Sequence, residues 1–143
     1  MADETPPPIS DGTPFKFGEH QFHFGNQIVE LVDSSPIKGD VDTLKSRMAD
    51  NGYLFIRGFH PREKAEAAAQ WTLQAIANRG GLQDSTPVSD GIIGPENKNF
   101  SFFRQLEVAH GQPLLDVVDS AETFAFYEMR FGGPVLTFDK RWL

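Results

Sequence analysis

The sequence predicts an α+β fold in which short strands alternate with amphipathic helices. Apolar and polar residues alternate near the start of the chain, as in a strand with one buried face. Farther along, apolar residues recur at helical spacing, and a continuous apolar segment rich in β-branched and aromatic residues lies between two such stretches. With 143 residues, 39% of them hydrophobic, the chain is long enough to bury one core.

Composition excludes several classes of function. Twenty Asp and Glu outnumber thirteen Lys and Arg, and the net charge of -7 argues against nucleic acid and anionic membrane surfaces as partners. The chain has no cysteine, which excludes disulfides, thiolate nucleophiles and zinc–thiolate sites. No apolar run is long enough to span a bilayer, and no basic region followed by an apolar stretch opens the chain. We therefore expect a cytoplasmic protein.

The first part of the chain predicts a lead-in followed by strands. Residues 1–13 are polar and proline-rich, and we expect them to form a disordered lead-in. Residues 15–17 and 21–24 alternate apolar and polar side chains around a glycine, which predicts a hairpin. Residues 28–32 are a third candidate strand.

The middle of the chain predicts a helix, a strand and a second helix. Asp40 is suited to an N-cap, and the sequence Asn51-Gly52 ends the helix that follows it. Residues 53–59 are apolar, β-rich and flanked by glycine, which predicts a buried strand. A long amphipathic helix then begins at Pro61 and ends at a pair of glycines. The centre of its buried face is expected at Ala65, Ala69, Thr72 and Ile76.

The last third predicts a loop, three helical stretches and a strand. Residues 82–99 are a long loop, and residues 100–110 and 113–118 are helical candidates. The spacing Asp119-x-x-Glu122 predicts a capping box. The helix that it opens carries Phe124, Tyr127 and Phe131 on one stripe and ends at Gly132-Gly133-Pro134.

Residues 135–143 predict a final strand with no terminator. Chain termini are usually polar and loosely held, whereas this strand ends on Trp-Leu. We therefore expect it to need strand partners from other polypeptide, and in isolation to leave an apolar edge that promotes self-association.

The four histidines do not predict a catalytic or metal site. His20 and His23 lie three apart on a predicted strand, where their rings point to opposite faces, so an ordinary surface hairpin is expected. Glu107-x-x-His110 has the spacing of helical carboxylate–metal sites, but the motif occurs once, and a surface ion pair is expected. His60 is placed as an N-cap or turn residue. Neither a nucleophile elbow nor a phosphate loop is present.

One face of the final strand offers a candidate binding surface. Phe138, Lys140 and Trp142 alternate with more polar residues, which would place a cation beside two aromatic rings. Such a face could bind a carboxylate in a concave sheet. The alternative is an edge strand whose cations are solvated.

The order of these elements resembles the N-terminal part of the phytanoyl-CoA dioxygenase family. The resemblance covers residues 40–143 and rests on the helix ending at Asn51-Gly52, the apolar segment 53–59, the helix from Pro61, and the segment from 113 to 142. Members of that family are non-haem Fe(II) and 2-oxoglutarate dependent oxygenases. Their core is a double-stranded β-helix, a barrel of the jelly-roll type.

The resemblance implies an oxygenase that hydroxylates a small organic substrate with Fe(II) and 2-oxoglutarate as cofactors. Family members bind iron through a His-x-Asp or His-x-Glu pair and a distal histidine. This sequence contains neither pair, so no metal ligand can be transferred to it. Residues 14–143 would then be helices and first strands of an incomplete barrel, truncated before the metal motif and inactive alone. Lys140 and Trp142 are implied as cosubstrate-binding positions.

Two alternatives stay open. The chain could be a non-enzymatic binding module that uses its aromatic helix, residues 124–131, and its final strand to pair with the edge of another chain. It could also be a small metalloprotein that uses His20, His23 and a carboxylate, although their spacing on a strand opposes this.

Overall fold

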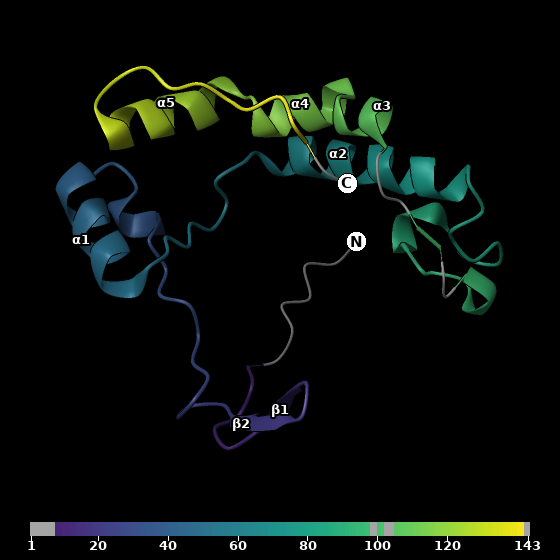
Figure 1. The fold of residues 1–143 in the computed structure, drawn as a ribbon, viewed down its shortest axis with the longest axis horizontal. Coiled ribbons are helices and arrows are strands. Elements are labelled where there is room, and N and C mark those ends of the chain that lie inside the picture. Colours follow the sequence, from purple (N-terminus) through teal and green to yellow (C-terminus); the bar gives the residue numbers. More distant parts are fainter. Residues whose placement is uncertain (1–7, 98–99, 102–104, 142–143) are drawn as a thin grey trace.

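The computed structural model shows a mixed α/β fold and describes residues 8–97, 100–101 and 105–141 (Figure 1). Within these residues one two-stranded sheet precedes five α-helices and three short 3-10 turns. The hairpin lies apart from the helices in Figure 1, and the chain after α5 runs back along α5 and α4. The expected mixture of helices and strands is therefore confirmed, whereas the barrel strands that were expected after the helices are not formed by the described residues.

The predicted hairpin is confirmed. Strands β1 (Pro14–Phe17) and β2 (His20–His23) pair antiparallel, with Phe15 opposite Phe22. Gly18 adopts a φ of 60° in the turn between them, a conformation that glycine accepts without strain. The lead-in expected over residues 1–13 falls partly outside the described residues, and Gly12 within it donates a hydrogen bond to the Phe24 carbonyl at 3.0 Å.

The strand predicted over residues 28–32 is wrong. Ile28 makes one isolated bridge with Phe24, and the residues after it are irregular until Asp33. Val29, Leu31 and Val32 are exposed, so their apolar character marks no buried sheet face in the described chain. A strand needs a neighbouring ladder, and here no second strand lies beside these residues.

Helix α1 (Val41–Asn51) begins and ends where its capping residues predict. An Asp40 carboxylate oxygen accepts the Thr43 backbone N–H at 3.1 Å, which satisfies one of the free donors of the first turn. Gly52 ends the helix in the left-handed region, with a φ of 75°. Leu44 is fully buried on this helix.

The strand predicted over residues 53–59 is also wrong. Its pairing is a single parallel bridge between Phe55 and Asp33, in which the Ser34 N–H donates to the Phe55 carbonyl at 2.7 Å. The partner chain turns away directly afterwards into the 3-10 turn η1 (Ser35–Ile37). An extended segment with one short contact cannot build a ladder, so it remains irregular.

Helix α2 (Arg62–Ala77) forms as predicted, with Pro61 at its N-cap position. It packs against α4 (Gln112–Val118) and α3 (Leu106–Ala109). Ala68 is its buried residue, whereas Ala65 and Ala69 of the expected face are exposed. Alanines at 65, 67, 68 and 69 leave the helical pattern ambiguous, and the position of α3 and α4 decides which of them is covered.

The long loop is confirmed within the described residues, and the helix after it is shorter than predicted. The loop contains the 3-10 turns η2 (Val88–Asp90) and η3 (Pro95–Asn97). A bridge between Leu82 and Ile93 closes it. Of the helix predicted over residues 100–110, α3 is the helical part, and residues 102–104 lie outside the described residues.

Helix α5 (Ala121–Phe131) begins one residue later than the predicted capping box. Ser120 is the N-cap, and its hydroxyl accepts the Thr123 N–H at 3.2 Å. Asp119 instead binds the side chain of Arg141. Ser120 therefore satisfies the N–H of Thr123, one residue beyond the Glu122 N–H that an Asp119 cap would have satisfied.

The final strand is wrong for the residues that the structure describes. Residues 134–141 are extended but belong to no sheet, and 142–143 lie outside the described residues. Leu136 and Phe138 are 99% and 81% exposed. Apolar alternation produced an extended backbone here, but no strand lies beside it in the described chain to form a ladder.

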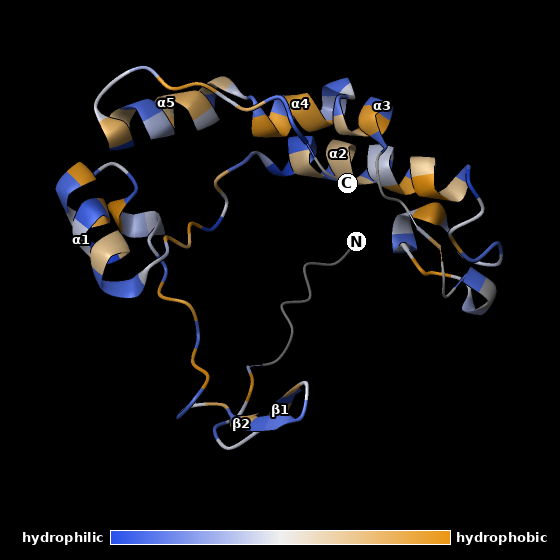
Figure 2. Ribbon diagram, viewed as in Figure 1, coloured by the Kyte–Doolittle hydropathy of each residue, from blue (hydrophilic) through white to orange (hydrophobic). Residues whose placement is uncertain are grey.

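The hydrophobic core is small, and much apolar surface faces outward (Figure 2). The whole chain exposes 10653 Å², whereas a folded chain of 15.9 kDa is expected to expose about 7,400 Å². The buried apolar residues among those described are Leu44, Ala68, Leu82, Val108 and Ala109. In the part of the chain that the structure describes, no helix combines the length and apolar character needed to cross a membrane.

Candidate functional site

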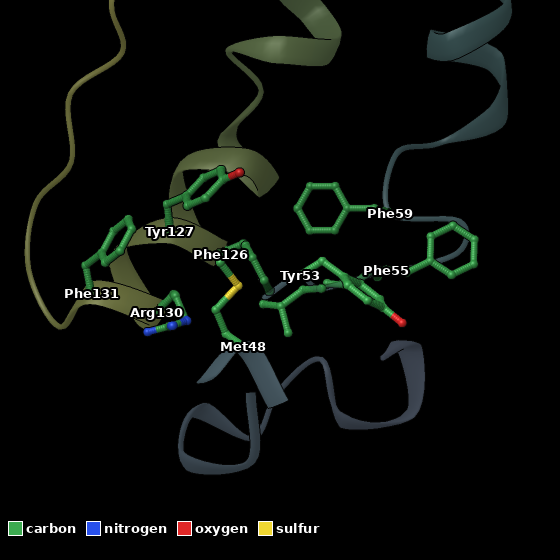
Figure 3. Close-up of a pocket in the computed structure, with 10 residues that line it drawn as sticks. Met48, Tyr53, Phe55, Phe59, Phe126, Tyr127, Arg130 and Phe131 are labelled. Carbon is green, nitrogen blue, oxygen red and sulfur yellow. The ribbon is translucent and has the colours of Figure 1, made fainter. Parts of the chain in front are cut away.

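An apolar groove lies between α1, the segment after it, and α5 (Figure 3). Its volume is about 490 Å³, within the range of small-molecule and peptide sites. We call it the aromatic groove. Its lining consists of Met48, residues 53–56, Phe59, Phe126, Tyr127, Arg130 and Phe131.

One wall of the aromatic groove is the irregular segment 53–59, which is held by hydrogen bonds to residues 32–35. The Val32 N–H donates to the Tyr53 hydroxyl at 3.0 Å. The Arg57 N–H donates to the Ser35 hydroxyl at 2.7 Å. These contacts fix the wall at both ends without a sheet, so the aromatic side chains between them keep defined positions.

A charged residue on the outer side of this wall supports the same arrangement. The Ser35 hydroxyl and backbone N–H donate to one Asp33 carboxylate oxygen at 2.6 and 2.8 Å. Arg57 lies 4.0 Å from the other oxygen. The Ser35 hydrogen bonds, with a smaller contribution from Arg57, hold the pKa of Asp33 below its usual value. Asp33 is therefore a structural anion and not a proton donor at neutral pH.

The opposite wall is the aromatic stripe of α5. Phe59 meets Phe126 edge-to-face, with ring centroids 5.1 Å apart, and this contact joins the two walls. Phe126 continues to Tyr127 at 5.6 Å, and Tyr127 stacks on Phe131 at 6.0 Å. Figure 3 shows the rings of Phe126, Tyr127 and Phe131 projecting from α5. Phe131 is 68% exposed and Tyr127 46%, so the stripe is only partly covered.

Arg130 is the charged residue among those that line the aromatic groove. Its guanidinium lies 5.9 Å from the Phe131 ring centroid. The groove therefore combines wide apolar walls with one cation and two tyrosine hydroxyls, a composition suited to contact and not to proton transfer. The carboxylates that would be needed for acid–base work are not in its lining.

A second hollow of about 280 Å³ lies on the other side of the α5 stripe. Its walls are α4, α5 and residues 135–137 of the extended C-terminal segment. Tyr127 and Phe131 line both hollows. The stripe is therefore a ridge with an apolar hollow on each side.

A polar cluster fastens the end of the C-terminal segment to the helices. We call it the C-terminal cluster, and it consists of His110, Asp119, Asp139 and Arg141. His110 follows α3, and its Nε2 lies 3.0 Å from an Asp139 carboxylate oxygen. Arg141 donates to the same oxygen at 2.9 Å and to the Asp119 carboxylate. Two residues of the segment thus bind the ends of two helices.

Proton affinities in this cluster follow from its contacts. Hydrogen bonds to the Leu106 carbonyl and to Asp139 raise the pKa of His110 above its usual value. The hydrogen bond and charge of His110, together with Arg141, lower the pKa of Asp139. Asp119, through its hydrogen bond, raises the already high pKa of Arg141. The charged forms of all three groups are favoured.

The residues that were considered as metal ligands are not brought together. The described residues contain no group of three or more histidine, cysteine, aspartate or glutamate side chains arranged to hold a metal ion. His20 and His23 lie exposed on β2, and the nearest polar partners of His23 are Gln21 and Gln27. The expected Glu107–His110 pair is replaced by His110–Asp139.

The remaining histidine, His60, has the second of its two expected roles. The N-cap of α2 is Pro61, so His60 is a turn residue. Its ring meets Phe59 edge-on at 4.8 Å, and its Nδ1 is buried without a hydrogen-bond partner in the described chain. A single nitrogen with no other ligand nearby offers no site for chemistry.

The candidate cosubstrate residues lie at the end of the extended segment. Lys140 is exposed there, and Trp142 lies outside the described residues. The sheet that would place Phe138, Lys140 and Trp142 on one concave face is not formed by the described residues. Their role in holding 2-oxoglutarate therefore stays a prediction.

Sequence reasoning missed Met48 and Tyr53 as groove residues, and the pairing of His110 with Asp139 and of Asp119 with Arg141. One signal was available for the pairing. Asp139 and Arg141 share a side of an extended segment, and the glycines before that segment turn it back toward α4. No local sequence pattern indicates the position of Tyr53 in the groove wall, because its hydrogen-bond partner Val32 is 21 residues away.

A scan against protein-family models, a search of curated proteins and a search of solved structures each found no match.

Proposed function

We propose that this chain forms the N-terminal helical layer of an Fe(II) and 2-oxoglutarate dependent dioxygenase of the phytanoyl-CoA dioxygenase type. In this proposal the jelly-roll barrel and its iron ligands come from polypeptide outside residues 1–143. The complete protein would hydroxylate a small organic substrate in the cytoplasm, a location that a chain without cysteine suits. The layer itself supports the barrel and performs no chemical step.

The observation that carries this proposal is the uncovered apolar ridge of α5 with a hollow on each side. Soluble monomers rarely leave so large a contiguous apolar surface exposed, and such a surface marks an interaction site. The extended residues 134–138 lie beside the ridge, and a barrel strand could pair with them. The helices α1, α2, α4 and α5 follow one another in the order that suggested the family, although the strands expected at 53–59 and after α5 are not formed by the described residues.

Iron and 2-oxoglutarate do not fit the residues that the structure describes. A facial iron site needs two histidines and a carboxylate on one face of the metal, and the described chain offers no such group. We therefore assign no cofactor contact to this chain. In this proposal, Lys140 and Trp142 are the residues of this chain that would lie closest to the 2-oxoglutarate pocket of the complete protein.

The test compares this chain alone with a longer one. Residues 1–143 should bind no stoichiometric Fe(II) in an anaerobic titration and should not decarboxylate 2-oxoglutarate. The reading frame beyond residue 143 should encode further strands with His-x-Asp or His-x-Glu, and the longer product should show both activities. Turnover by residues 1–143 that is lost in His20→Ala or His110→Ala would contradict the proposal, as would a longer frame without such a pair.

A second candidate is a non-enzymatic module that binds a protein partner through the same ridge. The exposure of Tyr127 and Phe131 favours it, because aromatic side chains dominate protein interfaces. A stop codon directly after residue 143 in the expressed transcript, together with a stable complex that Phe131→Ser abolishes, would select this function over the first.

A further inference from the structure

Side chains supply the contacts that fasten the C-terminal segment, residues 134–141, to the described helices. Gly132 turns the chain with a φ of 74°, and the segment then returns along α5 and α4 (Figure 1). No backbone-to-backbone hydrogen bond joins residues 134–138 to another segment of the described chain. At its far end, the side chains of Asp139 and Arg141 attach the segment to the helices in the C-terminal cluster.

We propose that the C-terminal cluster is a pH-sensitive latch, in which protonated His110 holds residues 134–141 along α4 and α5. The inference rests on the geometry of this cluster and is independent of the proposed function. When the latch opens, the second hollow loses the wall that Val135, Leu136 and Thr137 supply, and the far side of the α5 ridge becomes accessible.

The proton requirement follows from the two ring nitrogens of His110. Nδ1 lies 2.8 Å from the Leu106 carbonyl oxygen, and Nε2 lies 3.0 Å from the Asp139 carboxylate and 3.1 Å from the Asp139 carbonyl. Each nitrogen therefore faces an oxygen that can only accept. A neutral imidazole carries one N–H, whereas the imidazolium carries two, so the complete set of contacts requires the cation.

The charges around the ring determine how far the latch opens. Asp139 faces His110 from the C-terminal segment, and Glu107 and Lys140 are the charged neighbours in sequence on the two sides. Arg141 binds both Asp139 and Asp119 and is 15% exposed as a side chain. Because the Arg141 contacts persist at all physiological pH values, loss of the His110 proton weakens the attachment at His110 while the one at Arg141 remains.

The direction of the pH dependence is fixed by the raised pKa of His110. A histidine whose folded pKa lies above its unfolded value contributes stabilisation that is fully present below the unfolded pKa. That contribution is lost as the pH rises through the folded pKa. The latch is therefore closed in mildly acidic solution and loosens toward alkaline pH, and added salt weakens it because the Asp139 carboxylate is exposed.

The test uses the absence of cysteine in this chain. Leu136→Cys introduces a single thiol at a side chain that is 99% exposed, and a nitroxide attached there reports the mobility of the segment. Proton NMR of the imidazole rings follows the protonation of His110 in the same sample. We expect the pKa of His110 to lie above the usual histidine value, and the label to become more mobile with the same midpoint as His110.

Asp139→Asn is the decisive variant, because its exposed side chain is not part of the core. It should lower the pKa of His110 and reduce the pH dependence of label mobility, while the contacts of His110 with the Leu106 and Asp139 carbonyls remain. His20→Gln, an exposed histidine of the hairpin, should change neither. The proposal is overturned if the pKa of His110 is the same in the unmodified chain and in Asp139→Asn, or if the mobility transition persists unchanged in Asp139→Asn.

Discussion

The two ends of the helical region contrast in how their side chains are covered. At the packed end, α2, α3 and α4 enclose Ala68, Val108 and Ala109. At the open end, which consists of α1, residues 53–59, α5 and residues 134–141, apolar side chains line two hollows and face outward. The packed end is built from small residues, whereas the open end carries most of the exposed aromatic rings.

The two ends are therefore held in place by different kinds of contact. At the packed end, small residues allow backbones to approach, and the Trp71 indole N–H donates to the Val108 carbonyl at 3.1 Å across the helices. At the open end, capping and polar contacts hold helices and loops in place while apolar side chains such as Phe131 stay exposed. The first region covers its apolar side chains, and the second leaves many of them uncovered.

The largest expected effect is at the closest approach of the packed end. A Cβ at Gly111 would overlap the indole of Trp71, which is held by its hydrogen bond to Val108. We expect Gly111→Ala to lower the free energy of unfolding by about 1–3 kcal/mol, the usual cost of overpacking. Denaturant unfolding followed by circular dichroism measures it.

Gly133→Ala is the matched control at the open end. A Cβ there meets no atom within 4 Å, and the residue has no positive φ. Its free energy of unfolding should change by less than about 0.5 kcal/mol. Equal losses in the two variants would mean that the two ends do not differ in packing.

An intermediate effect is expected at the start of α5. The buried Ser120 hydroxyl accepts the Thr123 N–H, so Ser120→Ala removes the N-cap and should cost about 1 kcal/mol. Thermal unfolding reports the loss. Ser46→Ala in α1 is the control, because the Ser46 hydroxyl bonds to a carbonyl within the same helix and caps nothing. If Ser120→Ala leaves the free energy of unfolding unchanged, contacts other than this N-cap position the ridge.

The smallest effect on stability is expected on the ridge itself. Phe131→Ser removes a ring that is largely exposed, so the free energy of unfolding should stay within about 0.5 kcal/mol of the unmodified chain. Self-association in sedimentation and binding of a hydrophobic dye should both decrease. Ile93→Ser, 60% exposed on the long loop and away from both hollows, should leave them unchanged. A similar decrease in both variants would indicate general surface hydrophobicity and not a specific face.

The sequence predicts the elements whose signals are local. The Asp40 cap, the Asn51-Gly52 stop and the hairpin around Gly18 are each determined within a few residues, and each is confirmed. The N-cap of α5 is Ser120 and not the predicted Asp119, because both of these adjacent residues are able to cap a helix. Asp119 is then taken by Arg141, a partner 22 residues away that local pattern does not show.

The three strand predictions outside the hairpin are wrong for a different reason. Segments 28–32, 53–59 and 135–143 have strand composition, but a strand also needs a neighbour that supplies the ladder. In the described chain Phe55 finds one bridge, and residues 134–138 find none. The predicted stripe of Phe124, Tyr127 and Phe131 is confirmed as one face of α5. The aromatic groove beside this stripe also depends on Met48 and Tyr53, which other elements supply.

The hairpin is a suitable place to attach the protein to a surface. Its strands contact chiefly each other, and a side chain added at Gly18 would meet no atom within 4 Å. A reporter peptide inserted between Gly18 and Glu19 would therefore extend into solvent without touching the helices. Binding to the ridge could then be followed by immobilising the protein through its hairpin, with the contact surface left free.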